Sequence, residues 1–351
     1  MSSSLTPRRT VLLAAAAALA GVPGCGASRE ALLDDASADH LGQPGVVDGQ
    51  PSSVILAGFD LIEGAQERAA FGKALSIFRS GQTSGVETTI AAGSTLFRKL
   101  GVGDPDGMQR LPGFPGERID HRSSDGDVII QVCAGGIDPC RRLVDQYVKE
   151  SSRILKCRWR QSGFLPAHSE GETPRNLFRF KDGTENPVRS EFPKWVWDDR
   201  GGTFLVYRKI HMDVDRFLSL PTDRQENIIG RHRRSGAPLG SEEEKDLVDL
   251  FAKTSSGRYV IPVDSHVRLA HSRSDRGARM LRRGYSYDAG GGDQGLLFIA
   301  FMRDPALFVR VQQRLAGADA MNEFIEHRAS AVGYVLPVAV LERFRNGDFG
   351  D

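Results

Sequence analysis

Three short segments in the second half of the chain carry the side chains best suited to chemistry. The first, FKDGTENP, is rich in turn residues and holds the carboxylate of Asp182 where Gly183 and Pro187 restrict the backbone. The second, DSHVR, puts His266 directly after a strand-like run, and the third, LRRGYSY, contains Arg282 and a second arginine. A carboxylate, an imidazole and a guanidinium together can move a proton, bind a metal ion and stabilise developing negative charge.

Each segment has a simpler interpretation when it is taken alone. Asp-Gly is first of all a turn signal, a single histidine is more often hydrogen-bonded or exposed than a ligand, and paired arginines are commonly solvated. His232 and His271 compete with His266 for any histidine role, and both lie in basic, polar surroundings. The run RHRR around His232 would bind an anion or face solvent. The three segments are therefore specific only in combination.

The elements that must position these side chains occur twice along the chain. An apolar run at 127–133 leads into an amphipathic helix near Asp138-Pro139, and the run at 295–302 leads into another near Asp304-Pro305. Asp suits the N-cap and Pro the first helical position, and the apolar residues of both helices recur at intervals of three and four. Earlier in each half a strand precedes a helix, at 53–59 and 65–79 and again at 202–210 and 214–220.

Two copies of strand, helix, strand and helix predict an α+β fold made of two ferredoxin-like domains. Each would be an antiparallel sheet with helices on one face, and the length suits two domains. We place the first domain at 52–172 and the second, which holds the reactive side chains, at 173–351. The sequence SEEE at 241–244 forms a capping box and predicts one more helix in the second domain.

The N-terminal residues predict export. Arg8 and Arg9 precede residues 11–22, which carry no charge, are mostly Ala and Leu, and are too few to span a bilayer comfortably. TPRRTVL resembles the twin-arginine signal, whose translocase exports folded proteins; an ordinary Sec signal that contains two arginines is the alternative. We assign 1–27 to the signal peptide and 28–51, which is rich in Ala, Gly, Asp and Ser, to a flexible tether.

Cys25 leaves two forms of the mature N-terminus open. VPGC approximates a lipoprotein box, in which Cys25 would be lipidated and would anchor the protein to a membrane, although the proline fits that motif poorly. Cleavage near Ala27 would instead give a soluble protein. In both cases we expect a periplasmic or extracellular protein.

Composition argues against two further classes of protein. The formal charge is +1 and becomes −1 when Arg8 and Arg9 are removed, whereas a nucleic-acid carrier would show a basic excess. Beyond Cys25 three cysteines remain, and an odd number with this spacing is not a disulfide scaffold.

Taken together, the motifs resemble those of the dye-decolourising peroxidases, in particular the exported branch found in ferrous-iron-uptake operons. The resemblance covers roughly 53–337 and is carried, in this order, by FKDGTENP, IIGRHRRSGAPLG, DSHVRLAH, MLRRGYSY, DQGLLFIAF and GYVLP. It implies a fold of two ferredoxin-like halves, which agrees with the duplication above. It also implies haem insertion before export, which agrees with a twin-arginine signal.

The resemblance implies a role for each motif residue. His266 matches the proximal ligand of haem iron, and its second nitrogen should donate a hydrogen bond to an acceptor, for which Asp293 is the candidate. Asp182 matches the distal aspartate. Arg282 matches the distal arginine, with Arg283 as the alternative.

The cofactor implied by the resemblance is haem b. The sequence contains no CxxCH motif, so covalent attachment is not expected. The haem carboxylates need cations, and Arg268, two residues after His266, is the first candidate. Arg231 and Arg273 are further candidates.

The function implied is that of a haem peroxidase. It would reduce hydrogen peroxide through a ferryl intermediate and oxidise dyes, phenolics, ferrous iron or other metal ions. The alternatives are a haem-binding component of iron acquisition, similar to a deferrochelatase, or a haem carrier without enzyme activity. Arg179 stands where the family's distal motif has glycine, and its bulk is expected to shift the loop or to narrow access to the distal side.

Replacing Arg8 and Arg9 by lysine should leave folded precursor in the cytoplasm, because the twin-arginine translocase recognises the arginine pair. The measurement is the distribution of the protein between cytoplasmic and exported fractions. Continued export of folded protein in the double variant would refute the assignment. Incorporation of a labelled fatty acid, compared between the natural chain and Cys25→Ala, decides between the lipidated and the soluble form.

Overall fold

A computed structural model describes residues 42–62, 66–81, 84–169 and 171–349. The predicted signal peptide, with Arg8, Arg9 and Cys25, lies outside the described residues. Within them, no helix has both the length and the apolar character needed to cross a membrane.

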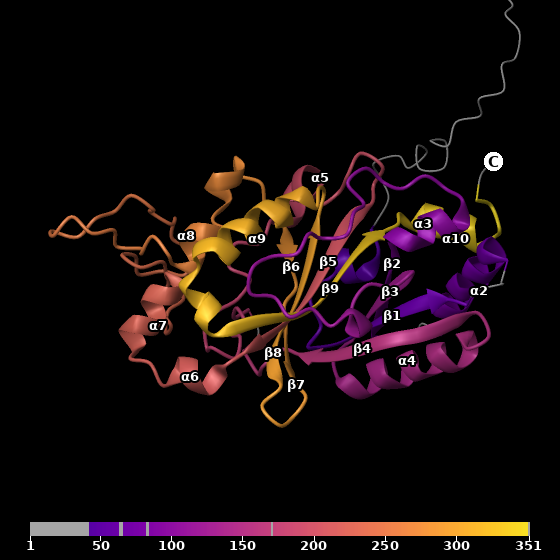
Figure 1. Cartoon of the computed structure of the whole chain (residues 1–351), viewed down its shortest axis with the longest axis horizontal. Helices are drawn as coiled ribbons and strands as arrows, with labels where there is room; N and C mark the ends of the chain where they lie inside the picture. The colour runs from indigo at the N-terminus through magenta and orange to yellow at the C-terminus, as the bar shows by residue number, and fades with distance from the viewer. Residues whose placement is uncertain (1–41, 63–65, 82–83, 170, 350–351) are drawn as a thin grey trace, which may run out of the picture.

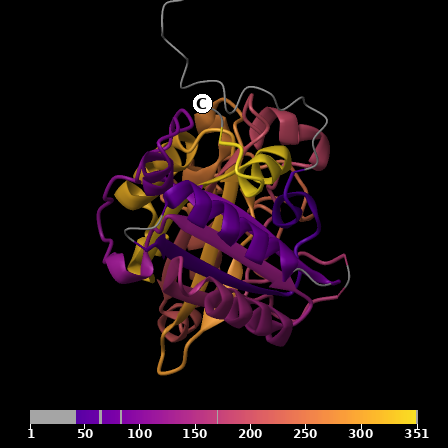
Figure 2. The ribbon, with the colours of Figure 1, turned by 90° about the vertical axis from the view of Figure 1, so that its right-hand side faces the viewer.

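The N-terminal half is an antiparallel sheet with two long helices on its outer face. The strands β1 (Ser53–Leu61), β2 (Val86–Gly93), β3 (Val128–Ala134) and β4 (Leu155–Phe164) lie in the order β2-β3-β1-β4. The helices are α2 (Glu67–Ser80) and α4 (Ile137–Ser151), and they cover the sheet (Figures 1 and 2). Helix α4 buries residues at intervals of three and four, including Leu143 and Tyr147, against the sheet.

The C-terminal half repeats this arrangement. Strand β5 (Thr203–Met212) lies between β9 (Ile325–Val335) and β8 (Gln294–Met302), and β8 also pairs with β6 (Leu281–Arg282) and β7 (Tyr285–Asp288). The helices after β5 are α6 (Val214–Leu218) and α7 (Thr222–Ile229), and α9 (Ala306–Ala318) follows β8. Both sheets thus have the strand order of a ferredoxin-like unit, and the predicted α+β duplication is confirmed.

Shorter helices occur between and beyond these elements. They are α1 (Pro44–Val47), α3 (Ser94–Leu100), α5 (Phe192–Trp195), α8 (His266–Ala270) and α10 (Val338–Arg345), with 3₁₀ turns at His121–Ser123, Arg189–Glu191, Ser272–Asp275 and Ala320–Glu323.

The two sheets pack face to face and share a core. Inward residues of both sheets form one buried apolar cluster, in which Trp159 of β4 stacks on Tyr207 of β5 with ring centroids 5.1 Å apart. Their edges also meet, because β2 pairs with β9 and Phe164 at the end of β4 pairs with Ser286 of β7. The outer face of the C-terminal sheet is therefore available to form a site with α8 and α9.

Two predicted boundaries need correction. Residues 42–51 were assigned to a flexible tether, but Gln43 and Val46 are buried and the segment packs on β2. The second domain was placed at 173–351, but α10 returns to the first half (Figure 1), where Phe344 packs on Phe71 of α2 with ring centroids 6.2 Å apart. Both chain segments are held by the apolar surfaces that they cover.

Candidate active site

A large cavity lies between the outer face of the C-terminal sheet and helices α8 and α9. It is partly open to solvent. Its sheet wall includes Ile210 and Met212 of β5 and Leu296 and Phe298 of β8, and its helical wall includes Leu307, Val311 and Leu315 of α9. The walls are therefore largely apolar, and the polar groups within them stand out.

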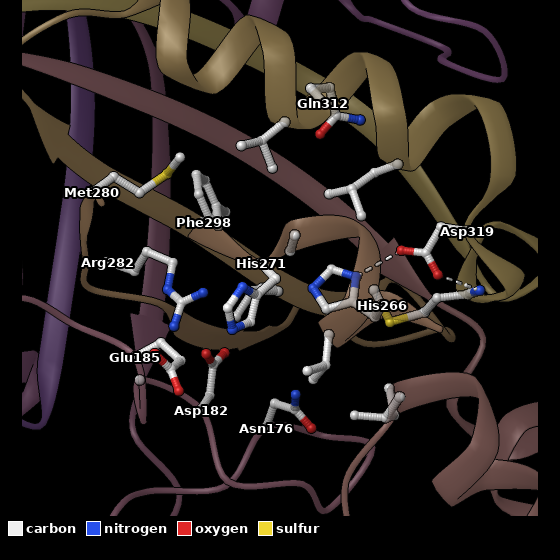
Figure 3. Close-up of a pocket in the computed structure, with 18 of the residues that line it drawn as sticks. Asn176, Asp182, Glu185, His266, His271, Met280, Arg282, Phe298, Gln312 and Asp319 are labelled. Carbon is white, nitrogen blue, oxygen red and sulfur yellow. Dashed lines mark hydrogen bonds and ion pairs between the residues drawn. The ribbon is translucent and has the colours of Figure 1, made fainter. Parts of the chain in front are cut away.

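His266 projects into the cavity from the first residue of α8. Its Nδ1 lies 2.6 Å from Oδ2 of Asp319, a residue that is only 4% exposed. A carboxylate accepts hydrogen bonds, so Nδ1 carries a proton. In the neutral imidazole the lone pair is therefore on Nε2, which points into the cavity (Figure 3). Burial opposes the charged imidazole, but the Asp319 carboxylate outweighs it and raises the pKa of His266 above the ordinary histidine value.

Asp319 is itself held in place by the backbone. It precedes the 3₁₀ turn Ala320–Glu323, and its Oδ1 accepts a hydrogen bond of 2.9 Å from the amide of Met321. The amide of Ala320 donates to the carbonyl of Asp264, two residues before His266. The connection between α9 and β9 thus fixes the orientation of the imidazole.

The prediction that Asp293 accepts the hydrogen bond of His266 was wrong. Asp293 lies at the far end of β8 and pairs with Lys209 and Arg328, at 2.9 and 3.1 Å, and with the hydroxyl of Tyr287 at 3.1 Å. It is not among the residues that line the cavity. Asp319 was missed because it lies 53 residues after His266 and in no motif, so only the folded chain brings them together.

The competing histidines lack this arrangement. His271 lines the cavity, but its Nδ1 accepts a hydrogen bond of 3.1 Å from the amide of Arg273, which places the proton on Nε2. That tautomer offers the cavity a donor rather than a lone pair. His232 pairs with Glu226 at 2.9 Å and is not part of the cavity wall. Of the three, His266 is the one prepared to bind a metal centre.

Asp182 and Arg282 lie across the cavity from His266 (Figure 3). The amide of Asp182 donates to the carbonyl of Pro174 at 2.9 Å, and Gly183 follows with φ 104°, a conformation that favours glycine. Both charges are close enough to influence the pKa of His266. The cavity thus has an imidazole on one side and a carboxylate with a guanidinium on the other.

Asn186, a residue not assigned any role from the sequence, holds the backbone of Arg282. Its side-chain Oδ1 accepts from the Arg282 amide at 2.9 Å and its Nδ2 donates to the Arg282 carbonyl at 2.8 Å. Among the residues that the structure describes, none forms a hydrogen bond with the buried guanidinium Nε of Arg282. The alternative, Arg283, instead donates to the backbone carbonyls of Val46 and Asp48 and does not line the cavity.

Arg231, a candidate partner of a haem carboxylate, lines the cavity and is 4% exposed. It donates to the carbonyl of Gly236 at 2.8 Å and to Glu185 Oε1 at 3.1 Å. Burial lowers its pKa, although Glu185 opposes the change.

The helix predicted to begin at 241–244 is absent from the described structure. The Glu244 carboxylate accepts hydrogen bonds from Lys181 and Thr173 and not from the backbone of its own capping box.

The predicted contact of Arg268 with a cavity ligand was wrong. Its guanidinium donates to the carbonyls of Ile261 and Pro262, at 2.6 and 3.0 Å, and lies over the ring of Tyr259. Arg273 likewise lies over Phe251. Neither arginine belongs to the cavity wall. Arg268 thus holds the loop that precedes α8, and Arg273 lies in the turn that follows it.

A buried charged group at one end of the cavity was also missed from the sequence. Arg208 of β5 is 1% exposed, pairs with Glu117 and donates to Nδ1 of His327 at 3.3 Å. Burial and the charge of Arg208 lower the pKa of His327 to about 3, so this imidazole is neutral. In β9 an extra residue, Arg328, shifts the register opposite Lys209 and turns His327 toward the cavity.

Arg179 adopts the backbone conformation that the distal motif requires. Its φ is 69°, in the left-handed region, and its side chain is exposed and does not line the cavity. The expected narrowing of the distal side is therefore not found. The cost of the substitution is conformational, since the left-handed region costs a residue with a Cβ about 1–2 kcal/mol.

Arg179→Gly should leave the free energy of unfolding unchanged or raise it by at most about 1 kcal/mol, because relief of the left-handed strain is partly offset by the entropy of glycine. Arg179→Val should lower it by about 1 kcal/mol or more, since a β-branched side chain fits this region worst. Urea unfolding of the two variants and the natural chain measures both. A clear loss of stability in the glycine variant would contradict this interpretation.

Comparison with known proteins identifies the family. Residues 53–165 match the family model for the N-terminal part of Dyp-type peroxidases, and residues 173–340 match that for the C-terminal part. The fold is similar to the crystal structure of a DyP-type peroxidase from Cellulomonas bogoriensis, with a TM-score of 0.79 and 30% identity over 87% of this chain and 95% of that one.

Two curated relatives have higher identity but extend beyond the aligned region. A dye-decolorizing peroxidase of Thermobifida fusca is 36% identical over an alignment of 288 positions, and the match covers 74% of this chain and 66% of the relative. A deferrochelatase of Yersinia pseudotuberculosis is 37% identical over an alignment of 276 positions, and the match covers 71% of this chain and 63% of the relative. The chain thus spans just under two thirds of the length of these relatives. With both family models matched in order and the fold shared, this chain belongs to the Dyp-type peroxidase family.

Proposed function

We propose that this protein is a haem peroxidase that reduces hydrogen peroxide and oxidises organic or metal donors. The observation that carries the proposal is the imidazole of His266, oriented by Asp319, facing Asp182 and Arg282 across an apolar cavity. Family membership supports the same activity. Export through the twin-arginine translocase is part of the proposal and is supported by Arg8 and Arg9.

The residues of the cavity fit haem b. His266 presents one imidazole lone pair, which suits an iron ion whose other ligands come from a macrocycle. Leu296, Phe298 and Leu315 provide apolar walls for the ring, and Arg231 provides a buried cation for a carboxylate. When bound, haem b would supply the redox chemistry, which is the reduction of peroxide and the one-electron oxidation of donors.

The protein's own groups would handle the proton and the charge. Asp182 would accept the proton of one peroxide oxygen and return it to the other, which then leaves as water. Arg282 would stabilise the negative charge that develops on the leaving oxygen, and its buried Nε and clamped backbone make it a preorganised donor. Asp319 would keep Nδ1 of His266 protonated, so that Nε2 remains a ligand.

His266→Ala should abolish the Soret absorption that appears when haem is added to the protein, because the imidazole that Asp319 orients toward the cavity is removed. His271→Ala is the matched control and should retain the band, since its Nε2 carries a proton. Added imidazole should restore a band in the His266→Ala protein. If the His266→Ala protein gave the same spectrum as the natural chain without added imidazole, the iron ligand would be another residue.

Arg282→Leu should slow the reaction of the haem-loaded protein with peroxide by about 10²–10³-fold, because a charge-stabilising donor is lost. Asp182→Asn should slow it by about 10²–10⁴-fold, because an amide cannot accept and return the proton. Stopped-flow absorption in the Soret region measures this step without a donor. If the Asp182→Asn protein bound haem and reacted with peroxide at the rate of the natural chain, Arg282 together with water would suffice for cleavage of the peroxide.

The name of the Yersinia relative favours a second candidate, a deferrochelatase-like role in iron acquisition. Removal of iron from haem would leave free porphyrin, which fluoresces, whereas haem does not. Incubation of the haem-loaded protein with a reductant and no peroxide tests this directly. Porphyrin fluorescence that rises with turnover would support iron release, and its absence would leave the peroxidase role.

A further inference from the structure

The segment at 42–51 lies outside the residues matched by the family models, yet it is bonded to the active-site half of the molecule. Gln43 donates to the carbonyls of Ile90 and Leu336, at 2.8 and 2.9 Å, and its Oε1 accepts from the Ile90 amide at 2.7 Å. At Gly45 a Cβ would lie 2.1 Å from Oγ1 of Thr89. The segment therefore fits closely against β2 and is a fixed part of the fold.

The same segment is bonded to the two residues that follow Arg282. Arg283 donates to the carbonyls of Val46, at 2.9 Å, and Asp48, and the side-chain Nε2 of Gln50 donates to the carbonyl of Gly284 at 2.9 Å. On the other side, Asn186 bonds both backbone groups of Arg282. The three residues 282–284 are thus clamped between the DGTENP segment and the N-terminal segment.

Gln50 also lines a second hollow that adjoins the active site. This hollow shares Asp182, Gly183 and Arg282 with the large cavity, and its other lining residues include Gln50, Thr173 and Gly284. Asp182 and Arg282 therefore stand between the two spaces. At Gly284 a Cβ would lie 3.5 Å from Oδ2 of Asp182 and 3.2 Å from Leu296, so glycine keeps room beside the carboxylate.

We propose that residues 43–50 position Arg282 and that the side chain of Gln50 sets the size of the opening through which small hydroperoxides reach Asp182 and Arg282. The hollow is lined mainly by polar groups, which suits hydrogen peroxide and disfavours bulky apolar hydroperoxides. The hydrogen bond from Gln50 to Gly284 positions Arg282. The volume of the Gln50 side chain restricts the opening. The proposal rests on the proposed function: the access role requires that haem bind in the large cavity, and the positioning role also requires that the haem-loaded protein react with peroxide.

Two variants separate the tasks of Gln50. Gln50→Met keeps the length of the side chain but removes the donor to Gly284, so it tests positioning. Gln50→Ala removes the donor and the volume, so it tests both. Gln146→Ala is the control, because Gln146 is an exposed residue of α4, bonded only to Glu150 nearby. Haem content and the resting spectrum are measured first and should be the same in all four proteins.

The decisive measurement compares ligands and oxidants of different size. Association rates of cyanide and of imidazole with the ferric haem protein report access without turnover, and rates with hydrogen peroxide and cumene hydroperoxide report access during reaction. Gln50→Ala should raise the association rate of imidazole relative to that of cyanide by about tenfold, in the range expected for a side-chain-sized change in a pocket. It should raise the reaction rate of cumene hydroperoxide relative to that of hydrogen peroxide by a similar factor. Gln50→Met should leave both rate ratios unchanged. It should slow the reaction with hydrogen peroxide by about fivefold, as expected for one lost hydrogen bond.

Each outcome has a distinct meaning. Unchanged ratios in Gln50→Ala would overturn the access role, and an unchanged hydrogen peroxide rate in Gln50→Met would overturn the positioning role. If the natural chain bound haem but did not react with peroxide, the proposed function would fail while the ratio of imidazole to cyanide would still decide the access role. If the natural chain bound no haem, both proposals would fail together.

Discussion

The hydrogen bond between His266 and Asp319 is the interaction on which the rest of the site depends. It decides which nitrogen of His266 carries the proton, and so whether the cavity is offered a lone pair or a donor. Asp319 is almost fully buried, and a buried carboxylate without partners would be costly. The imidazole and the amide of Met321 satisfy its two oxygens. The pair therefore stabilises both members, and neither is expected to turn away.

The duplicated fold explains why this pair can face a second group across a cavity. The two sheets bury their inner faces against each other, so the C-terminal sheet has its outer face left to build a site. Helix α9 crosses that face and ends directly before Asp319, while α8 begins at His266. On the opposite side, the short β6 pairs with β8 and carries Arg282. The site thus lies where a helix and a loop meet one sheet, and the N-terminal half contributes mainly the support behind it.

An element of the fold or a residue of the site could be predicted from the sequence where the contacts that determine it are local in the chain. Apolar runs predicted β1, β3, β5 and β8 because a strand buried on both faces has few polar residues at any position. His266, Asp182 and Arg282 lie in short motifs, and the structure brings all three to one cavity. By contrast, Asp319 and Asn186 act through contacts 53 and 96 residues away in the chain, which no local pattern records.

Local signals also misled where a tertiary contact was stronger. The capping box at 241–244 does not start a helix, since the Glu244 carboxylate is taken by Lys181 and Thr173 of a distant segment. Arg268 is close to His266 in sequence, but its five donors are better satisfied by backbone carbonyls of its own loop than by the cavity. The small, polar composition of 42–51 is typical of a tether, yet small residues are what close packing against β2 requires.

The charges in the cavity wall indicate which arginine is kept for chemistry. Arg208 pairs with Glu117, and Arg231 pairs with Glu185, so each buried guanidinium has a carboxylate beside it. Within the described part of the chain Arg282 forms no such pair, and its buried Nε has no hydrogen-bond partner. An unsatisfied buried donor costs about 1–3 kcal/mol, and more when it is charged. A fold that clamps this residue by its backbone and leaves its side chain unpaired holds a donor ready for a negative charge that arises during the reaction.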